Sequence, residues 1–317
     1  MAATIGDYLA KSAALKDASA SCKLKMRIVG DQYSTLAGIK QATIKSINGA
    51  RNLEGQPLIK PLTPKEITIF KSIKKEIDPE KSLEENFIVL LTANFIQRQL
   101  TMLKGFGLED MNTNPLLCSA LKMDTVSDLV KYNVYAAATR SIVTSMGYLI
   151  ENLLLYSNSD IITGKDFAEG DSNKWDLVIQ RLGQVRCYIE VKSGPNDLDK
   201  TQIKSYAREI QAVEAEGHRG FIGISYGRKD VETVTTNLLR LYMTDWETHT
   251  LIGTELWDFV SGNPEYHEQL MVVIQRTAAD ILRNKSIIKL IDLKIRQLVN
   301  AFNERYPSIE AYYAQLW

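Results

Sequence analysis

The spacing of apolar residues changes about halfway along the chain, and the change predicts two kinds of structure. Before Ser157 apolar residues recur mainly three or four positions apart, which is typical of amphipathic helices. After Ser157 short apolar runs appear between helical segments, and turn residues bound them. The runs predict strands at 174–180, 185–192 and 220–226, and another around 240–243. The chain therefore begins as a mainly helical region and continues as an α/β region.

Helix starts are clearest where a capping residue precedes an apolar stripe. The string TPKE at 63–66 combines an N-cap, Pro at the first helical position and Glu at the third, and it predicts a helix through Ile77. Ser82 with Glu85 repeats the capping signal before a helical stripe at 87–103.

The other predicted helices rest on apolar spacing alone. They lie at 5–15, 125–138, 140–156, 200–216, 254–260, 265–282 and 286–306, with a short tail at 308–315. The glycines between residues 19 and 61 predict a loop-rich segment, and Gly105, Gly107 and Asn114-Pro115 predict a break. Because a helix connects the strand at 185–192 to the strand at 220–226, we expect an α/β sheet core flanked by helices.

Charge is balanced over the whole chain, so a nucleic-acid partner would need a local basic surface. The chain has 317 residues, 45% of them hydrophobic, with 38 Lys and Arg against 38 Asp and Glu. The N-terminal stretch is one candidate surface, although a solvated helix face explains the same charges. Its basic residues are Lys11, Lys16, Lys23, Lys25, Arg27, Lys40, Lys45, Arg51 and Lys60.

Several classes of protein are disfavoured by what the sequence lacks. Cys22, Cys118 and Cys187 are widely spaced without a CxxC pair, so neither a disulfide framework nor a zinc site is indicated, and a reducing cytoplasmic location is expected. No signal peptide or membrane-spanning apolar run is visible. No phosphate-binding glycine loop is present, so we expect no nucleotide cofactor.

Two carboxylates and an ammonium fall at one edge of the predicted sheet. Asp176 opens the strand at 174–180, and Glu190 and Lys192 end the next strand after a turn at 182–184. Residues two apart on a strand share a face, so Glu190 and Lys192 point the same way. Carboxylate and carbonyl oxygens suit Mg²⁺ beside a phosphodiester, and the Val191 carbonyl adds a third oxygen. A Glu-x-Lys triplet also occurs by chance on exposed strands, which leaves a structural interpretation open.

Glu151 lies in the apolar helical string MGYLIENLLL at 146–155. A carboxylate there costs desolvation free energy unless it meets a cation, a metal or a donor. We interpret Glu151 as a further active-site residue; the alternative is a carboxylate that reaches solvent or pairs with a lysine.

Trp175-Asp176 followed by Glu190-Val191-Lys192 resembles the PD-(D/E)XK nuclease motif, with Trp175 where the nominal motif has Pro. The string IEVKSGPN at 189–196 is similar to type II restriction endonucleases. The subgroup that cuts interrupted sites of the GGNCC kind is resembled by NPL at 114–116 ahead of GYLIE at 147–151, and by VIQR at 178–181, GISYG at 223–227 and GTELW at 253–257. The resemblance covers roughly residues 114–303.

The resemblance implies a restriction-endonuclease-like mixed sheet in a nuclease domain at 114–317, after a helical region at 1–113 that could serve as a DNA-contacting arm. It implies that Asp176 and Glu190 bind Mg²⁺, that Lys192 assists the water and that Glu151 supports the metal site. It further implies a homodimer that cuts double-stranded DNA at a short palindromic site within a restriction-modification system, leaving 5′-phosphate and 3′-hydroxyl ends.

Two other functions stay open, a structure-specific repair or recombination nuclease and a non-enzymatic DNA-binding protein. Candidate DNA contacts follow two of the strands, and each can equally be solvated surface. They are Asn196, Lys200, Gln202, Arg228 and Lys229. The helical stripe at 290–302 is interpreted as either core or dimer interface, and the Trp and Tyr residues of the C-terminal third as packing or dimer contacts.

Overall fold

The computed structural model describes residues 4–163, 175–283 and 285–316, and the chain forms two compact units. The first comprises Met1–Leu91 with Leu149–Ile274, and the second comprises Thr92–Tyr148 with Gln275–Trp317. This division reflects packing alone. The functional division into a helical region at 1–113 and a nuclease domain at 114–317 stays a prediction.

The N-terminal region is more helical than its glycines suggest. Its elements are α1 (Ile5–Lys11), α2 (Ala20–Gly30), α3 (Leu36–Gln41), α4 (Ile44–Gly49) and α5 (Pro64–Glu76). The predicted loop-rich segment at 19–61 was therefore wrong over most of its length. Ser19, Thr35 and Thr43 cap its three helices.

Two of these glycines serve helix packing instead of turns. A Cβ on Gly30 would lie 2.5 Å from the Gly6 Cα, and a Cβ on Gly6 would lie 2.4 Å from the Arg27 carbonyl oxygen. The backbones of α1 and α2 thus approach each other where only glycine fits. The spacing of glycines alone cannot separate this use from a turn.

The capping signals predicted the next helices correctly. Thr63 and Glu66 form the capping box of α5, and Ser82 Oγ accepts from Glu85 N–H at the start of α6 (Leu83–Gly105). A short helix, α7 (Pro115–Ala120), follows Asn114 as its N-cap and was not predicted. The two helices predicted at 125–138 and 140–156 are one helix, α8 (Val126–Leu155), because no glycine or proline separates them.

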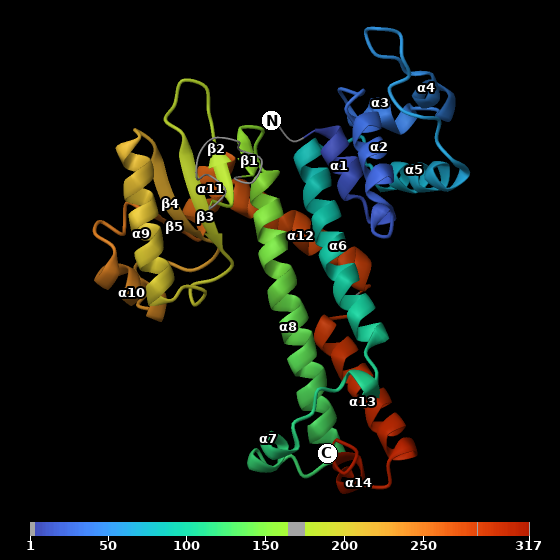
Figure 1. The fold of residues 1–317 in the computed structure, drawn as a ribbon, viewed down its shortest axis with the longest axis vertical. Coiled ribbons are helices and arrows are strands. Elements are labelled where there is room, and N and C mark those ends of the chain that lie inside the picture. The colour runs from blue at the N-terminus through green and yellow to red at the C-terminus, as the bar shows by residue number, and fades with distance from the viewer. Residues whose placement is uncertain (1–3, 164–174, 284, 317) are drawn as a thin grey trace. The chain divides into compact units, whose positions relative to one another are not determined.

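A mixed five-stranded sheet forms the core of the first unit, as expected (Figure 1). Its strands, in spatial order, are β1 (Ile161–Thr163), β2 (Leu177–Ile179), β3 (Cys187–Lys192), β4 (Arg219–Ile224) and β5 (Thr250–Ile252). The β1–β2 and β2–β3 pairs are antiparallel, whereas β3–β4 and β4–β5 are parallel. The crossover helix between β3 and β4 is α9 (Lys200–Ala215), which confirms the predicted α/β connection.

The strand expected around 240–243 was wrong. That segment ends α10 (Val234–Tyr242), which starts at a capping box formed by Thr233 and Thr236. Leu239 is fully buried beneath the helix, so the apolar run covers the sheet instead of joining it. The true edge strands β1 and β5 have only three residues each, too few for their periodicity to show.

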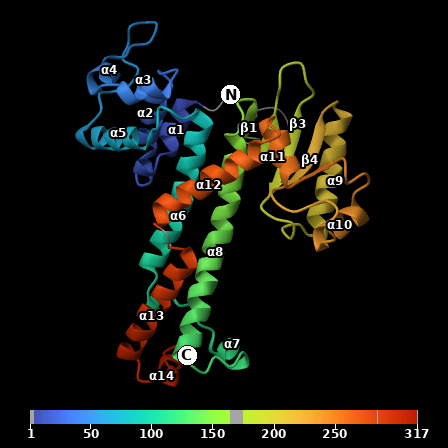
Figure 2. The ribbon, with the colours of Figure 1, turned by 180° about the vertical axis from the view of Figure 1, so that it is seen from behind.

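Helices cover both faces of the sheet (Figure 2). On one face Tyr188 and Ile222 pack with Ile203 and Ile210 of α9 in a single buried cluster. On the other face α11 (Thr254–Ser261) approaches so closely that a Cβ on Gly223 would lie 2.7 Å from a Leu256 methyl carbon. The sheet is thus a rigid, doubly covered platform for residues at its edge.

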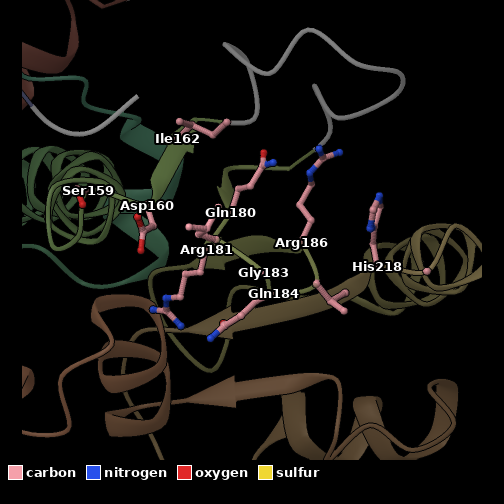
Figure 3. Close-up of a pocket in the computed structure, with 12 residues that line it drawn as sticks. Ser159, Asp160, Ile162, Gln180, Arg181, Gly183, Gln184, Arg186 and His218 are labelled. Carbon is pink, nitrogen blue, oxygen red and sulfur yellow. The ribbon is translucent and has the colours of Figure 1, made fainter.

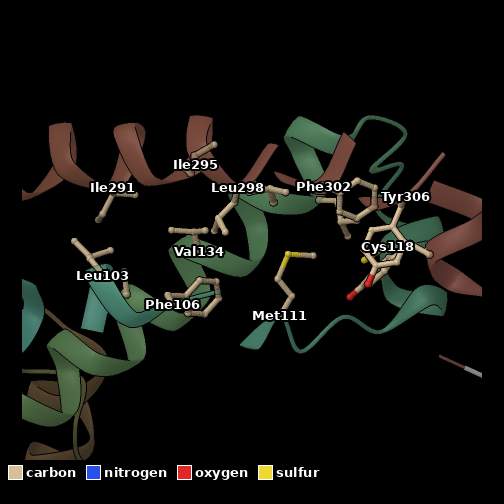
Figure 4. Packing of buried hydrophobic residues seen from close by; sticks show 14 residues of the cluster. Leu103, Phe106, Met111, Cys118, Val134, Ile291, Ile295, Leu298, Phe302 and Tyr306 are labelled. Atoms are coloured by element: carbon tan, nitrogen blue, oxygen red, sulfur yellow. The ribbon is translucent and has the colours of Figure 1, made fainter. Parts of the chain in front are cut away.

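The second unit has its own apolar core, to which α13 (Ile287–Arg305) contributes a buried stripe (Figure 4). Ile291, Ile295, Leu298 and Phe302 are at most 5% exposed, which identifies this stripe as core, whereas Leu293 is 46% exposed. The remaining helices are α12 (Tyr266–Leu282) and α14 (Ile309–Tyr313). In this core Tyr312 is buried and Tyr313 is partly buried. Trp246 and Trp257 are buried within the first unit, as packing residues would be. Trp317 lies outside the described residues.

Candidate active site

Glu190 and Lys192 form a direct ion pair at the end of β3. The Lys192 Nζ lies 2.6 Å from the Glu190 Oε1, and Glu190 is only 8% exposed. Both side chains lie on the sheet face that α9 covers, as their two-residue spacing predicts. Burial lowers the pKa of the Lys192 ammonium, but the hydrogen bond to Glu190 and the charge of Glu190 raise it by more. The net shift of the Lys192 pKa is therefore upward. Lys192 is therefore a cation at neutral pH.

Asp176 is placed beside this pair by the end of the β2–β3 pairing. Asp176 directly precedes Leu177, whose partner in β3 is Ile189, so Asp176 lies beside the end of β3 that carries Glu190 and Val191. The Asp176 N–H donates to the Ile189 carbonyl at 3.1 Å, and its Oδ2 accepts from the Val191 N–H at 2.8 Å. The carboxylate thus takes the ladder bond that a longer β2 would have accepted.

The Val191 carbonyl faces the same side as Asp176. Ser225 N–H donates to the Lys192 carbonyl, so that carbonyl points toward β4. Carbonyls alternate in direction along a strand, and the Val191 carbonyl therefore points toward the β2 side. Asp176, Glu190 and the Val191 carbonyl thus all lie at the end of β3 that carries Lys192.

The Asp176 carboxyl holds its proton more tightly than an ordinary aspartate. Burial raises its pKa to about 6, and the charges of Glu190 and Glu151 add to the rise. The hydrogen bond from Val191 N–H and the charge of Lys192 oppose it but do not cancel it. An excess of negative charge at a partly buried site is the electrostatic pattern that a cation would relieve.

Glu151 contributes to this charge from α8. It is partly buried, and its charge raises the pKa of Asp176. The structure thus brings the carboxylate of a separate helix into the electrostatic neighbourhood of the β2 and β3 residues.

Tyr206 is a site residue that the sequence reasoning missed. Its hydroxyl donates to the same Glu190 Oε1 at 2.7 Å, and Lys192 Nζ lies 5.2 Å from its ring centroid. Burial and the Glu190 hydrogen bond raise the pKa of Tyr206 to about 12. A sequence signal existed, because Tyr206 lies three residues after Ile203 and four before Ile210, on the buried face of α9.

If the chain is a nuclease, as its resemblance implies, Tyr206→Phe is expected to lower the cleavage rate about tenfold while leaving the fold intact, as removal of a partner that orients a catalytic group does. The ring that packs beside Lys192 is retained, and only the hydrogen bond to Glu190 is lost. Single-turnover kinetics measure the effect. Tyr242→Phe is the matched control, since Tyr242 lies on α10 and contacts Lys200 and Lys204 instead of Glu190. Equal rates for both variants would contradict a role for Tyr206.

Comparison with known proteins identifies a family for the chain. The family model described as type II restriction endonuclease EcoO109I matches residues 83–281, more than half of the chain and the whole of the sheet. A search of curated proteins finds no match.

The chain belongs to the EcoO109I family of type II restriction endonucleases. The family is one of nucleases that act on double-stranded DNA, and the match includes Glu151, Asp176, Glu190 and Lys192. It begins at α6, within the region that the sequence resemblance had left unassigned.

The loop after β3 of this endonuclease is tied to the end of β4. Ser225 Oγ donates to the Ser193 carbonyl at 2.7 Å, and the Trp257 indole N–H donates to the Ser225 carbonyl at 2.8 Å. A Cβ on Gly194 would lie 2.6 Å from the Tyr226 hydroxyl oxygen, so a larger residue there would displace the Tyr226 ring. These contacts give the strings at 189–196, 223–227 and 253–257 one structural purpose, a fixed edge beside the carboxylates.

The five candidate DNA contacts differ in how they are held. Asn196 is exposed, Gln202 completes the α9 capping box with Asp199, and Lys200 Nζ lies 5.0 Å from the Tyr242 ring centroid. Arg228 and Lys229 form ion pairs with Asp230 and Glu255, respectively. On binding DNA, every one of these residues except Asn196 would exchange its present partner for a phosphate or a base. The DNA-binding role of all five residues stays a prediction.

A cavity of about 760 Å³ lies at the opposite end of β2 and β3 from the carboxylates (Figure 3). Gln180, Arg181, Arg186 and His218 line it, together with the turn at Gly183. Arg181 donates to the carbonyls of Phe259 and Val260, which anchors the β2–β3 turn to α11. This cavity contains none of the residues that the sequence motif singles out.

The oxygen donors at the sheet edge fit a hard divalent cation that keeps part of its hydration shell. Asp176, Glu190 and the Val191 carbonyl supply three oxygens, and Mg²⁺ is commonly held by one or two carboxylates with waters completing its octahedron. Within the described residues no group of three or more His, Cys, Asp and Glu side chains is arranged to hold a metal. In the part of the chain that the structure describes, no helix is long and apolar enough to cross a membrane.

Proposed function

We propose that the chain is a Mg²⁺-dependent type II restriction endonuclease that hydrolyses both strands of duplex DNA at a short palindromic site of the GGNCC kind. The observation that carries the proposal is the placement of Asp176 against Val191, beside the Glu190–Lys192 pair, within a family of DNA nucleases. A nuclease centre of the PD-(D/E)XK kind accounts for the four candidate catalytic residues, Asp176, Glu190, Lys192 and Glu151.

Asp176 and Glu190 would hold Mg²⁺, which supplies charge stabilisation to the phosphate and acidity to bound water. Hydrolysis forms a bond between a water oxygen and phosphorus and breaks the bond from phosphorus to the 3′ oxygen. The products are a 5′-phosphate and a 3′-hydroxyl. The 3′ oxygen gains one proton from water as it leaves, and the second proton of the attacking water passes to solvent when the 5′-phosphate ionises.

Lys192 is assigned to an electrostatic role. Its raised pKa keeps it protonated, so it donates hydrogen bonds to the attacking water or to a phosphate oxygen and does not serve as the base. Tyr206 and Lys192 both contact Glu190 Oε1, so they compete with a cation for that oxygen and also fix its direction. Glu151 would support the same site from α8.

A homodimer follows from the symmetry of the target. A palindromic duplex presents the same sequence on both strands, and two equivalent active sites related by a two-fold axis cut each strand once. The exposed side chains beside β3 and β4, Asn196 and Arg228 among them, are the proposed DNA contacts.

Digestion of a sequenced plasmid with Mg²⁺, followed by mapping and religation of the fragment ends, tests this function. Discrete fragments with religatable ends at one GGNCC-type sequence, lost on chelation of the metal, are expected. Cutting only at branches or ends would indicate a repair nuclease instead. DNA binding with no cleavage under any divalent cation would indicate a non-enzymatic role and contradict the proposal.

A further inference from the structure

The N-terminal helices contact the segment of α8 that carries Glu151. Lys11, the last residue of α1, donates from Nζ to the Asn152 Oδ1 at 2.9 Å. The same Nζ lies 5.9 Å from the ring centroid of Tyr156, one turn further along the chain. Asn152 directly follows Glu151, so the ammonium of Lys11 holds the turn of α8 from which Glu151 projects.

The ammonium of Lys11 interacts electrostatically with Glu151, one of the candidate active-site carboxylates. Burial lowers the pKa of Lys11, and the charges of Glu151 and Asp7 counteract that shift. Glu151 also acts on Asp176, whose pKa it raises. One carboxylate thus interacts both with a lysine of the N-terminal helices and with an aspartate at the sheet edge.

Aromatic packing fixes the position of α1 against this part of α8. Tyr156 stacks on Phe87 with ring centroids 4.1 Å apart, and Tyr8 of α1 packs edge-on against the same Phe87 ring at 5.4 Å. Ser12, the residue after Lys11, donates from Oγ to the Glu76 Oε2 at 2.6 Å. The backbone that carries Lys11 is therefore held on both sides, although the residue itself remains exposed along part of its length.

We propose that Lys11 is a positioning residue of the nuclease site, which holds the Glu151–Asn152 turn of α8 and makes the N-terminal helices part of the catalytic unit. The inference rests on the proposed function, because it assumes that Glu151 serves the metal site. Of the basic residues in the N-terminal stretch, Lys25, Arg27 and Lys40 bond to Glu66, Asp7 and backbone carbonyls, respectively, away from the sheet edge.

Lys11→Met tests this role, since it removes the ammonium and keeps the apolar stem. We expect kcat to fall about tenfold, as for other partners that orient a catalytic group, with KM for DNA and the unfolding temperature unchanged. Lys11→Arg should restore most of the rate, because a guanidinium can still reach Asn152. Lys16→Met, at an exposed position beyond the same helix, is the matched control and should cleave like wild type.

A second variant keeps the test decisive if Lys11→Met folds poorly. Asn152→Leu removes the other half of the hydrogen bond and should lower kcat to the same extent, and the double variant should lose no more than either single one. An unchanged kcat, a rise in KM alone, or failure of arginine to restore activity would overturn the proposal. Asp176→Asn, measured alongside, separates failure of the proposed nuclease function from failure of the proposed role of Lys11. If Asp176→Asn still cleaves DNA, the nuclease function itself is wrong.

Discussion

Asp176→Asn is expected to abolish DNA cleavage and, at the same time, to make the metal-free protein more stable. Burial and the charges of Glu190 and Glu151 raise the pKa of Asp176 to about 6, so its ionised form is unfavourable in the folded protein. Asparagine is uncharged and its side-chain oxygen can still accept from the Val191 N–H. Loss of a metal carboxylate should remove the charge stabilisation on which hydrolysis depends.

The stability gain should depend on pH in a defined direction. An aspartate in the unfolded chain ionises near pH 3.8, whereas folded Asp176 ionises near 6. Between these values the folded state binds more protons than the unfolded state, so wild-type stability falls as pH rises through this window. The penalty is absent below about pH 4 and complete above about pH 7, where it is on the order of 3 kcal/mol.

Urea unfolding in the presence of a chelator measures this difference. Wild type and Asp176→Asn should unfold at similar urea concentrations near pH 4, and the variant should unfold later near pH 7. Asp17→Asn changes the same charge at an exposed position and should track wild type at both values. A variant that is less stable than wild type near neutral pH would show that Asp176 is not strained by its carboxylate neighbours.

Lys192→Met is expected to slow cleavage strongly, but with the opposite effect on stability. Glu190 is 8% exposed, and of the two contacts described above for its Oε1 it would keep only the hydrogen bond from the Tyr206 hydroxyl. Breaking a partly buried ion pair by removing one partner costs about 3 kcal/mol. The loss of an ammonium beside the scissile phosphate should lower the cleavage rate about 10²- to 10³-fold.

Divalent cation should repair stability in this variant without repairing activity. Mg²⁺ can take the place of the ammonium at Glu190 but cannot supply its hydrogen bonds to the attacking water or phosphate. Thermal unfolding with and without Mg²⁺, together with single-turnover cleavage, gives both quantities. Lys71→Met, at an exposed position on α5, is the control. A Lys192→Met protein as stable as wild type in chelator would argue against the ion pair, and wild-type cleavage would argue against its catalytic role.

The sequence predicted that Asp176, Glu190 and Lys192 lie near one another, whereas it missed the strands at the edges of the sheet. Two-residue spacing on a strand is enough to align Glu190 with Lys192, and a turn at Gly183 is enough to return the chain so that Asp176 bonds to Val191 beside them. Capping residues such as Thr63 defined helix starts correctly because the cap is a local hydrogen bond. These features depend on few residues that are close in sequence.

The features that were missed depend on contacts distant in sequence. Gly30 was interpreted as a loop residue because its packing against Gly6 cannot be read from spacing. The apolar run at the end of α10 has the composition of a strand. In the structure it ends a helix that packs on the sheet through Leu239, a contact that the local sequence does not reveal. Tyr206 reaches Glu190 from a separate helix, so no motif around Glu190 could include it.

The central claim is that the carboxylates at the edge of β2 and β3 carry out metal-dependent cleavage of duplex DNA. Its most direct test is the single-turnover rate, with saturating Mg²⁺, at which wild type, Asp176→Asn and Glu190→Gln cut one duplex that contains the mapped site. We expect cleavage by wild type alone, with both variants folded and still binding the duplex. Cleavage by either variant at the wild-type rate would contradict the assignment of this site.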